Sequence, residues 1–101
     1  MRTLLFFDLP SVTGPEKREY RHFVKFLKGE GFIMVQESVY AKLSINQIHV
    51  DSTLNSIKKH LPKAGSVAAL TVTEKQFAAI HYLMGEFNSD VVESDCKFIQ
   101  L

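Results

Sequence analysis

The 101-residue sequence has one cysteine, Cys96, and no apolar run approaching the length of a membrane span. A single cysteine excludes an intrachain disulfide and is consistent with a reducing cytoplasm. A membrane helix needs about 20 apolar residues, so we expect no membrane partner. The short apolar run near the start contains Asp8, which is unlike a signal peptide. We therefore expect a cytoplasmic protein with a single domain, residues 1–101, in which 76–101 form a C-terminal extension.

Several chemical motifs are missing too. The sequence has no Gly-rich phosphate loop and no nucleophile-elbow motif. The histidines form no His-x-x-x-His pair, so the case for zinc is weak; they are His22, His49, His60 and His81. The net charge of +1 is unevenly spread, with eleven Lys/Arg against seven Asp/Glu in residues 1–75 and an acidic remainder. This distribution suits either ordinary surface charge or a nucleic-acid partner.

The first ten residues are the most informative stretch that is present. Leu4, Leu5, Phe6 and Phe7 are consecutive large apolar residues, followed by Asp8 and a loop rich in turn residues. Successive side chains of a strand point to opposite faces, so a strand over 1–9 would be buried on both faces. Such a strand belongs at the centre of a sheet that is covered on both sides.

Two helices are predicted from capping boxes and apolar spacing. Thr13 and Glu16 open a helix over 14–29 whose apolar stripe is Tyr20, Phe23, Val24 and Leu27. Ser44 and Gln47 fit a second capping box, before the apolar positions Val50, Leu54, Ile57 and Leu61. Pro62 should stop this second helix.

Strands are expected between and after these helices. The β-favouring segments are Phe32–Gln36, Ser38–Leu43 and Ser66–Thr73, with a turn or bulge at 36–38. A short helix from Glu74 is favoured by Phe77, Ile80, Met84 and Phe87, and Lys97–Leu101 is predicted to be a terminal strand. The order β-α-β-β-α-β predicts an α+β, ferredoxin-like fold. A second subunit is the simplest cover for the face without helices, which predicts a homodimer, and the terminal strand should pair with a sheet edge.

Asp8 is the first candidate for chemistry. Aspartate is a common turn residue, so Asp8 could cap the turn between strand and helix. Alternatively, a twofold axis near the end of the first strand would bring two copies of Asp8 together. Mg²⁺ often uses one or two carboxylates and keeps several waters. Such a site could activate water for hydrolysis of a phosphodiester.

The first helix carries a basic stripe. Its cations are Lys17, Arg18, Arg21, Lys25 and Lys28, with Glu16 and Glu19 among them. The stripe is compatible with a solvated helix face. It is also compatible with binding to a phosphate backbone without reading its sequence.

The motifs taken together resemble a known family. A strand ending Phe-Phe-Asp8-Leu, then Lys17-Arg18 in a helix, then Gly31-Phe32 and Val35-Gln36-Glu37-Ser38-Val39-Tyr40 are similar to the small CRISPR-associated endoribonuclease family, the Cas-two subunit of spacer acquisition. The segment Thr73–Phe77 and the acidic tail resemble its type II branch. The resemblance covers nearly the whole chain.

The resemblance implies a ferredoxin-like homodimer in which Asp8 binds Mg²⁺ near the dimer interface. It implies a metal-dependent nuclease acting on RNA or DNA. It also implies that the dimer bridges two dimers of the CRISPR integrase and binds the duplex DNA to be inserted. Three alternatives stay open: a non-catalytic scaffold of the same complex, a toxin-type ribonuclease of the same fold, and a regulatory ligand-binding module.

Overall fold

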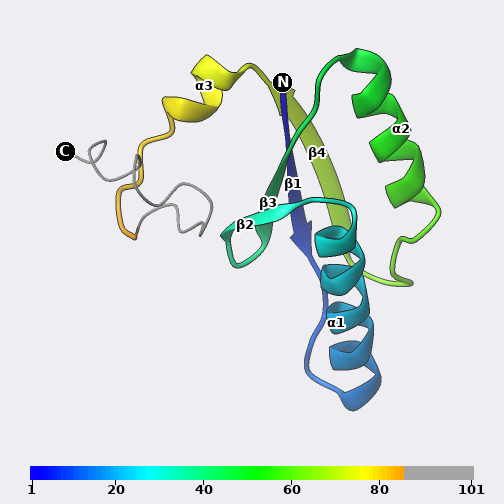
Figure 1. Cartoon of the computed structure of the whole chain (residues 1–101). Helices are drawn as coiled ribbons and strands as arrows, with labels where there is room; N and C mark the ends of the chain where they lie inside the picture. Colours follow the sequence, from blue (N-terminus) through cyan, green and yellow to red (C-terminus); the bar gives the residue numbers. More distant parts are fainter. Residues whose placement is uncertain (86–101) are drawn as a thin grey trace.

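The structure describes residues 1–85, and their four strands form an antiparallel sheet with the order β2-β3-β1-β4. This computed structural model contains β1 (Arg2–Asp8), α1 (Gly14–Gly29), β2 (Ile33–Gln36), β3 (Val39–Leu43), α2 (Gln47–Lys58), β4 (Ser66–Val72) and α3 (Glu74–Ala78). α1 and α2 lie on one side of the sheet, and α3 lies on the other (Figure 1). The predicted α+β, ferredoxin-like order is confirmed.

The central position predicted for the first strand is correct. β1 pairs with β3 on one side and with β4 on the other. Leu5 and Phe7 point toward α1, where the Phe7 ring makes edge contacts with Tyr20 and Phe23 at 6.0 and 5.4 Å between centroids. Leu4 points the opposite way and is buried as well. Both faces of β1 are therefore apolar, as the run of consecutive large residues indicates.

α1 begins and ends where its sequence signals place it. The Thr13 side chain accepts from the Glu16 backbone N–H, and Glu16 accepts from the Thr13 N–H, so the capping box is complete. Phe23 and Leu27 are buried on the sheet. Gly31 follows the helix at φ +100°, a conformation that side chains disfavour. The predicted turn at 36–38 is present at Glu37 and Ser38, and a register shift lies just before it, between Met34 and Gln36.

The second helix differs from its prediction at both ends. Its N-cap is Asn46, whose side chain accepts from the His49 N–H, so a capping box from Ser44 is wrong. Ser44 is instead held at the end of β3 by backbone hydrogen bonds to Met1 in both directions. The helix ends at Lys58, so Leu61 lies beyond it and is 48% exposed. Strand pairing outweighs the local capping pattern here.

The face away from α1 and α2, which the sequence predicts to be without helices, is partly covered by α3 and the residues after it. Thr73 caps α3, and Phe77, Ile80 and Tyr82 pack with Leu4 on this face. Arg2 pairs with Glu74 at 2.9 Å and lies 4.5 Å above the Phe77 ring. We call the side with α1 and α2 the helical face and the side with α3 the open face.

α3 is shorter than its apolar spacing suggests. It ends at Ala78, so Ile80 and Met84 lie after the helix, and Met84 is 89% exposed. β4 ends at Val72 because Thr73 is already the N-cap. The predicted positions of Phe87, the polar loop and the terminal strand Lys97–Leu101 lie outside the described residues, as does Cys96.

Candidate metal centre and nucleic-acid surface

Asp8 is the last residue of β1, and its side chain belongs to the open face. Side chains alternate along a strand, and Leu5 and Phe7 pack on the helical face. Leu4, Phe6 and Asp8 therefore point the other way. The carboxylate is exposed and has no hydrogen-bond or ion-pair partner among residues 1–85. The described chain thus gives no support to Asp8 as a cap of the following turn.

An apolar strip leads along the open face to Asp8. Phe6 is 39% exposed and Leu70 is 53% exposed, and the residues opposite Phe6 are Val39 and Ala68. A hollow of about 490 Å³ lies beside this strip, between β1, the β2–β3 turn and residues 80–84. The carboxylate therefore stands at the end of a partly uncovered apolar surface.

Metal binding at Asp8 needs more ligands than one chain supplies in its described part. Residues 1–85 contain no group of three His, Cys, Asp or Glu side chains that could hold a metal ion. The donor chemistry nevertheless fits Mg²⁺, which prefers oxygen and accepts one or two carboxylates with several waters. A second copy of the strand end would supply the second carboxylate. The strand position, exposure and lack of partners of Asp8 suit this arrangement.

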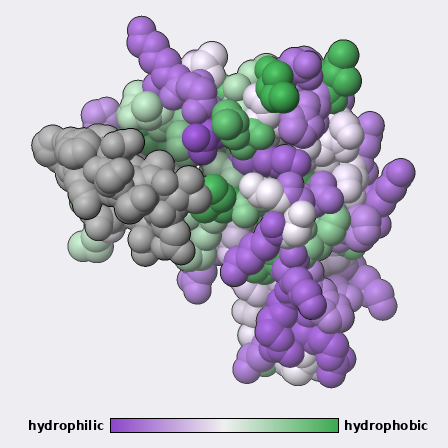
Figure 2. All heavy atoms as spheres, in the orientation of Figure 1, coloured by the Kyte–Doolittle hydropathy of each residue, from purple (hydrophilic) through white to green (hydrophobic). Residues whose placement is uncertain are grey.

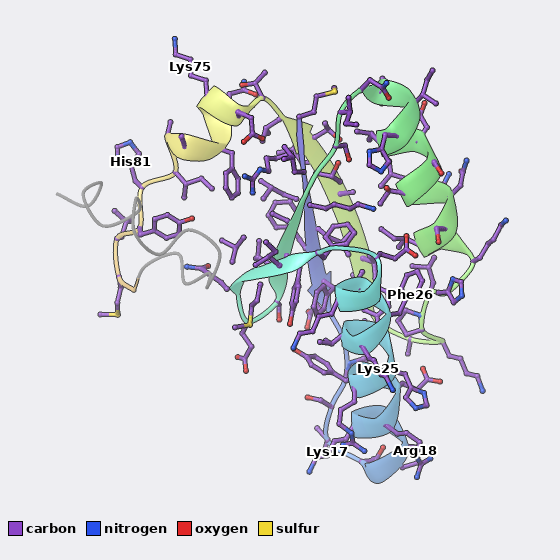
Figure 3. All side chains as sticks on the ribbon, viewed as in Figure 1. Lys17, Arg18, Lys25, Phe26, Lys75 and His81 are labelled. Atoms are coloured by element: carbon purple, nitrogen blue, oxygen red, sulfur yellow. The ribbon has the colours of Figure 1, made fainter. Side chains whose placement is uncertain are left out.

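The basic residues of α1 are exposed. Lys17 and Arg18 lie on the first turns of α1, and Lys25 lies further along it (Figure 3). Arg21 is exposed on the same helix. α1 packs on the helical face, whereas Asp8 belongs to the open face. The structure therefore places these cations and Asp8 on different sides of the sheet rather than in one pocket.

The two glutamates of α1 accept hydrogen bonds from the backbone and form no ion pair with the basic stripe in the described residues. Glu16 accepts from the backbone N–H groups of Val12 and Thr13, both at 3.0 Å, and these hydrogen bonds lower the pKa of Glu16. Glu19 accepts from the backbone N–H of Lys63 at 3.1 Å. In the part of the chain that is described, no cation of α1 forms an ion pair. Figure 2 shows the resulting hydrophilic surface along α1.

A second group of cations, which sequence reasoning missed as a candidate, lies next to this surface. Lys58, Lys59 and Lys63 are exposed at the end of α2 and after it. The His60 ring stacks on Phe26 of α1 with 4.2 Å between centroids, so this segment is held against α1. The run Lys58-Lys59-His60 is the signal that could have found it, although the same run also suits a complement to the helix dipole.

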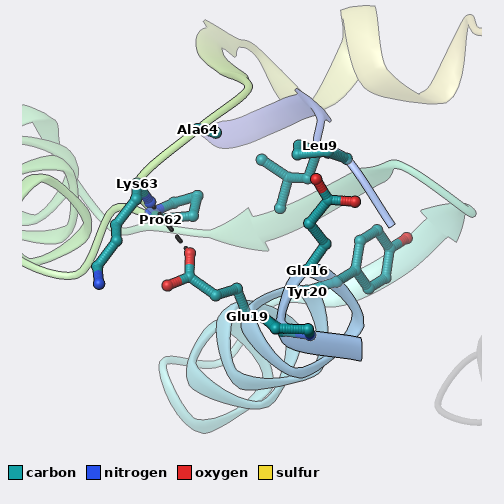
Figure 4. Close-up of a pocket in the computed structure, with 9 residues that line it drawn as sticks. Leu9, Glu16, Glu19, Tyr20, Pro62, Lys63 and Ala64 are labelled. Carbon is teal, nitrogen blue, oxygen red and sulfur yellow. Dashed lines mark hydrogen bonds between the residues drawn. The ribbon is translucent and has the colours of Figure 1, made fainter. Parts of the chain in front are cut away.

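A pocket of about 240 Å³ lies where α1 meets the segment after α2 (Figure 4). Its walls are Leu9 and Pro10 after β1, Glu16, Glu19 and Tyr20 of α1, and the segment Pro62–Ala64. The hydrogen bond from Lys63 to Glu19 crosses it (Figure 4). Glu16 and Glu19 are the acidic residues of its walls, and both accept hydrogen bonds from backbone N–H groups.

The fold and these two surfaces define a class: small ferredoxin-like proteins with an acidic strand end and a basic helix. The sequence profile of the family described as "CRISPR associated protein Cas2" matches residues 1–80. A "CRISPR-associated endoribonuclease Cas2" of Streptococcus mutans is 46% identical over 101 residues, which is 100% of this chain and 93% of that protein. The chain belongs to the Cas2 family.

One further relative and one solved structure are also similar to this chain. A "CRISPR-associated endoribonuclease Cas2" of Treponema denticola is 43% identical over 101 residues and is covered over its full length. The crystal structure of Streptococcus pyogenes Cas2 at pH 6.5 superposes with a TM-score of 0.65 at 19% identity, over 83% of this chain and 100% of that one. The structural likeness supports the fold. No helix within residues 1–85 has the length and apolarity to cross a membrane.

Proposed function

We propose that this chain acts as a homodimeric, Mg²⁺-dependent endonuclease of CRISPR spacer acquisition, with one Asp8 from each subunit at its metal centre. The observation that carries the proposal is Asp8 itself: an exposed carboxylate at a strand end, without a partner in residues 1–85, beside an uncovered apolar strip. The relatives' names as endoribonucleases support hydrolysis of a phosphodiester. Membership of the Cas2 family supports the pathway.

The chain's own residues have distinct tasks in this proposal. Mg²⁺ would polarise a phosphate oxygen and make a bound water more acidic. The two Asp8 carboxylates would hold the ion. The strip around Phe6 and Leu70 holds the two subunits together by excluding water from apolar surface. Lys17, Arg18, Arg21 and Lys25 of α1 attract the phosphate backbone of RNA or duplex DNA.

The integrase is proposed as the protein partner, with the dimer bridging two integrase dimers in the cytoplasm. This part rests on the family alone. A scaffold that bridges and holds DNA without cutting is the second candidate. Its support is that the described part of one chain offers a single acidic ligand. A metal site then forms only if two chains bring their copies of Asp8 together. A toxin-type ribonuclease has no observation in its favour beyond the shared fold.

Replacement of Asp8 separates nuclease from scaffold. Asp8→Ala should lower Mg²⁺-dependent cleavage of RNA or duplex DNA by at least about 100-fold, since even residues that only support metal ligands are worth about 10–100-fold. EDTA should abolish the cleavage by the unaltered protein. Asp51→Ala is the matched control, because Asp51 is an exposed aspartate on α2. Equal cleavage by Asp8→Ala and the control would overturn the catalytic role, and full integration by Asp8→Ala with the integrase would favour the scaffold.

The basic surface is tested by the salt dependence of binding. Replacing both Arg21 and Lys25 by Gln should weaken duplex binding and reduce the slope of log affinity against log salt by about 1 for each of the two cations that binds a phosphate. Lys75→Gln is the control, because Lys75 lies on α3 at the far side of the molecule from α1 (Figure 3). An unchanged slope in the double variant would place the nucleic acid elsewhere.

A further inference from the structure

We infer that the Ser66 hydroxyl positions a metal-bound water beside Asp8. The inference rests on the proposed function, because it concerns the same metal centre. Ser66 is the first residue of β4, and it stands directly opposite Asp8 in the register of the β1–β4 pair. Residues that face each other across antiparallel strands share a face and have Cβ atoms about 4.5–5.5 Å apart. The hydroxyl and the carboxylate therefore stand together on the open face.

The pair differs from its neighbours along the same two strands. On the open face, Phe6 stands opposite Ala68 and Leu4 stands opposite Leu70. Asp8 and Ser66 are thus a polar pair at the end of an apolar row. Both side chains are exposed, and neither has a hydrogen-bond partner in the described 85 residues.

A polar pair on the other face of the same strands provides a contrast. Thr3 stands opposite Thr71, and their hydroxyls lie 3.4 Å apart, within hydrogen-bond distance. That pair satisfies itself and is partly buried. Asp8 and Ser66 have the same kind of placement but do not bond to each other. Their donor and acceptor groups remain available to a shared ligand, for which a hydrated cation has the right chemistry.

Gly65 keeps Ser66 in this position. Its φ is +104°, and a Cβ at Gly65 would lie 2.6 Å from the Asp8 backbone oxygen and 3.0 Å from the Leu9 Cα. The turn before β4 therefore passes directly against the end of β1, which is possible because Gly65 has no side chain. This close approach of the two backbones holds Ser66 opposite Asp8.

The hydroxyl is suited to a supporting role. A Mg²⁺ ion held by one or two carboxylates keeps several waters, and these waters donate hydrogen bonds. The Ser66 oxygen can accept one of them while Asp8 binds the ion. Ser66 is thus a positioning residue that acts through the metal-bound water, and Asp8 is the ligand. Residues that support a metal in this way are typically worth about 10–100-fold in metal affinity or activity.

The test compares two substitutions of equal shape. Ser66→Thr keeps the hydroxyl, whereas Ser66→Val replaces it by a methyl group, and both β-branched side chains suit a strand. Mn²⁺ binding to the full chain, measured by electron paramagnetic resonance without nucleic acid, should be within about 2-fold of the unaltered protein for Thr and about 10-fold weaker for Val. Cleavage in Mg²⁺ should follow the same order. Ser52→Val, at an exposed serine of α2, is the control.

Asp8→Ala, measured in parallel, distinguishes the possible failures. Loss of Mn²⁺ binding in Asp8→Ala with equal affinities for Thr and Val at position 66 would overturn the role of Ser66 and leave the proposed function intact. Unchanged Mn²⁺ binding in Asp8→Ala would overturn the proposed metal centre and the role of Ser66 with it. Thermal unfolding of each variant checks that it is folded. We expect both the Thr and the Val protein to be folded, because residue 66 is at an exposed strand position.

Discussion

The two faces of the sheet differ in how completely their side chains are buried. On the helical face, Leu5, Phe7 and Leu27 are almost fully buried with α1 and α2, and the polar pair Thr3–Thr71 satisfies itself. On the open face, α3 covers Leu4, but Phe6 and Leu70 stay partly exposed. The helical face therefore carries the stability of the fold. The open face keeps apolar and acidic groups exposed, and the proposed subunit interface and metal centre depend on them.

The largest expected effect is on the helical face. Leu27 is 0% exposed, so Leu27→Ala should lower the free energy of unfolding by about 2–5 kcal/mol through reduced burial and the cavity that remains. Phe6→Ala removes a larger side chain that is already 39% exposed, and it should cost about 1 kcal/mol at protein concentrations where the chain is monomeric. Urea unfolding measures both.

The comparison of the two faces would fail if Phe6→Ala cost as much as Leu27→Ala under those dilute conditions. Phe6 would then be a core residue of the single chain, and the strip that contains it would not be available to a second subunit.

The next effect concerns association rather than folding. Phe6→Lys places a charge in the apolar strip, and burying that charge between subunits is unfavourable. We expect at least a roughly 10-fold weaker dimer by sedimentation equilibrium, with the monomer still folded. Ile48→Lys is the control, because Ile48 is an apolar residue of α2 that is 79% exposed on the helical side. Equal dimer affinity in the two variants would show that the open face is not the interface.

Most of the fold is predictable because its signals are local. The capping box at Thr13, the consecutive apolar residues of β1 and the turn at 36–38 indicate the correct elements. The start of α2 is missed because Ser44 fits a capping box, while its backbone is already bonded to Met1, 43 residues away. No pattern around Ser44 reports that long-range pairing.

The candidate site is predictable in part for the same reason. Asp8 ends a recognisable strand, so its exposure at the strand end follows from the sequence around it. Ser66 is not a candidate from sequence, because its relation to Asp8 depends on the register of β1 with β4. The cover that α3 gives to Leu4 is also missed, since the contact of Phe77 with β1 is made through the fold and not through neighbours in sequence.

The smallest expected effect is on the pH dependence of thermal stability, and it concerns the two capping boxes, one on each side of the sheet. In α1 the box is closed by Glu16, whose pKa is lowered by the N–H groups of Thr13 and Val12, whereas in α3 it is closed by the neutral Gln76. A lowered pKa in the folded state gives stability that is present above the unfolded pKa and lost as the pH falls through the folded one. The melting temperature of Glu16→Gln should therefore lie slightly below that of the unaltered protein at about pH 7, and the gap should close at acidic pH, once Glu16 is protonated in the folded protein as well.

Gln76→Glu should introduce the same dependence into α3, because its carboxylate would accept from the Thr73 N–H as Glu16 does from Thr13. Thermal unfolding followed across the same pH range measures both variants against the unaltered protein. A gap of constant size between neutral and acidic pH would contradict the role of the Glu16 charge, because a contribution from that charge must disappear when the carboxyl is protonated.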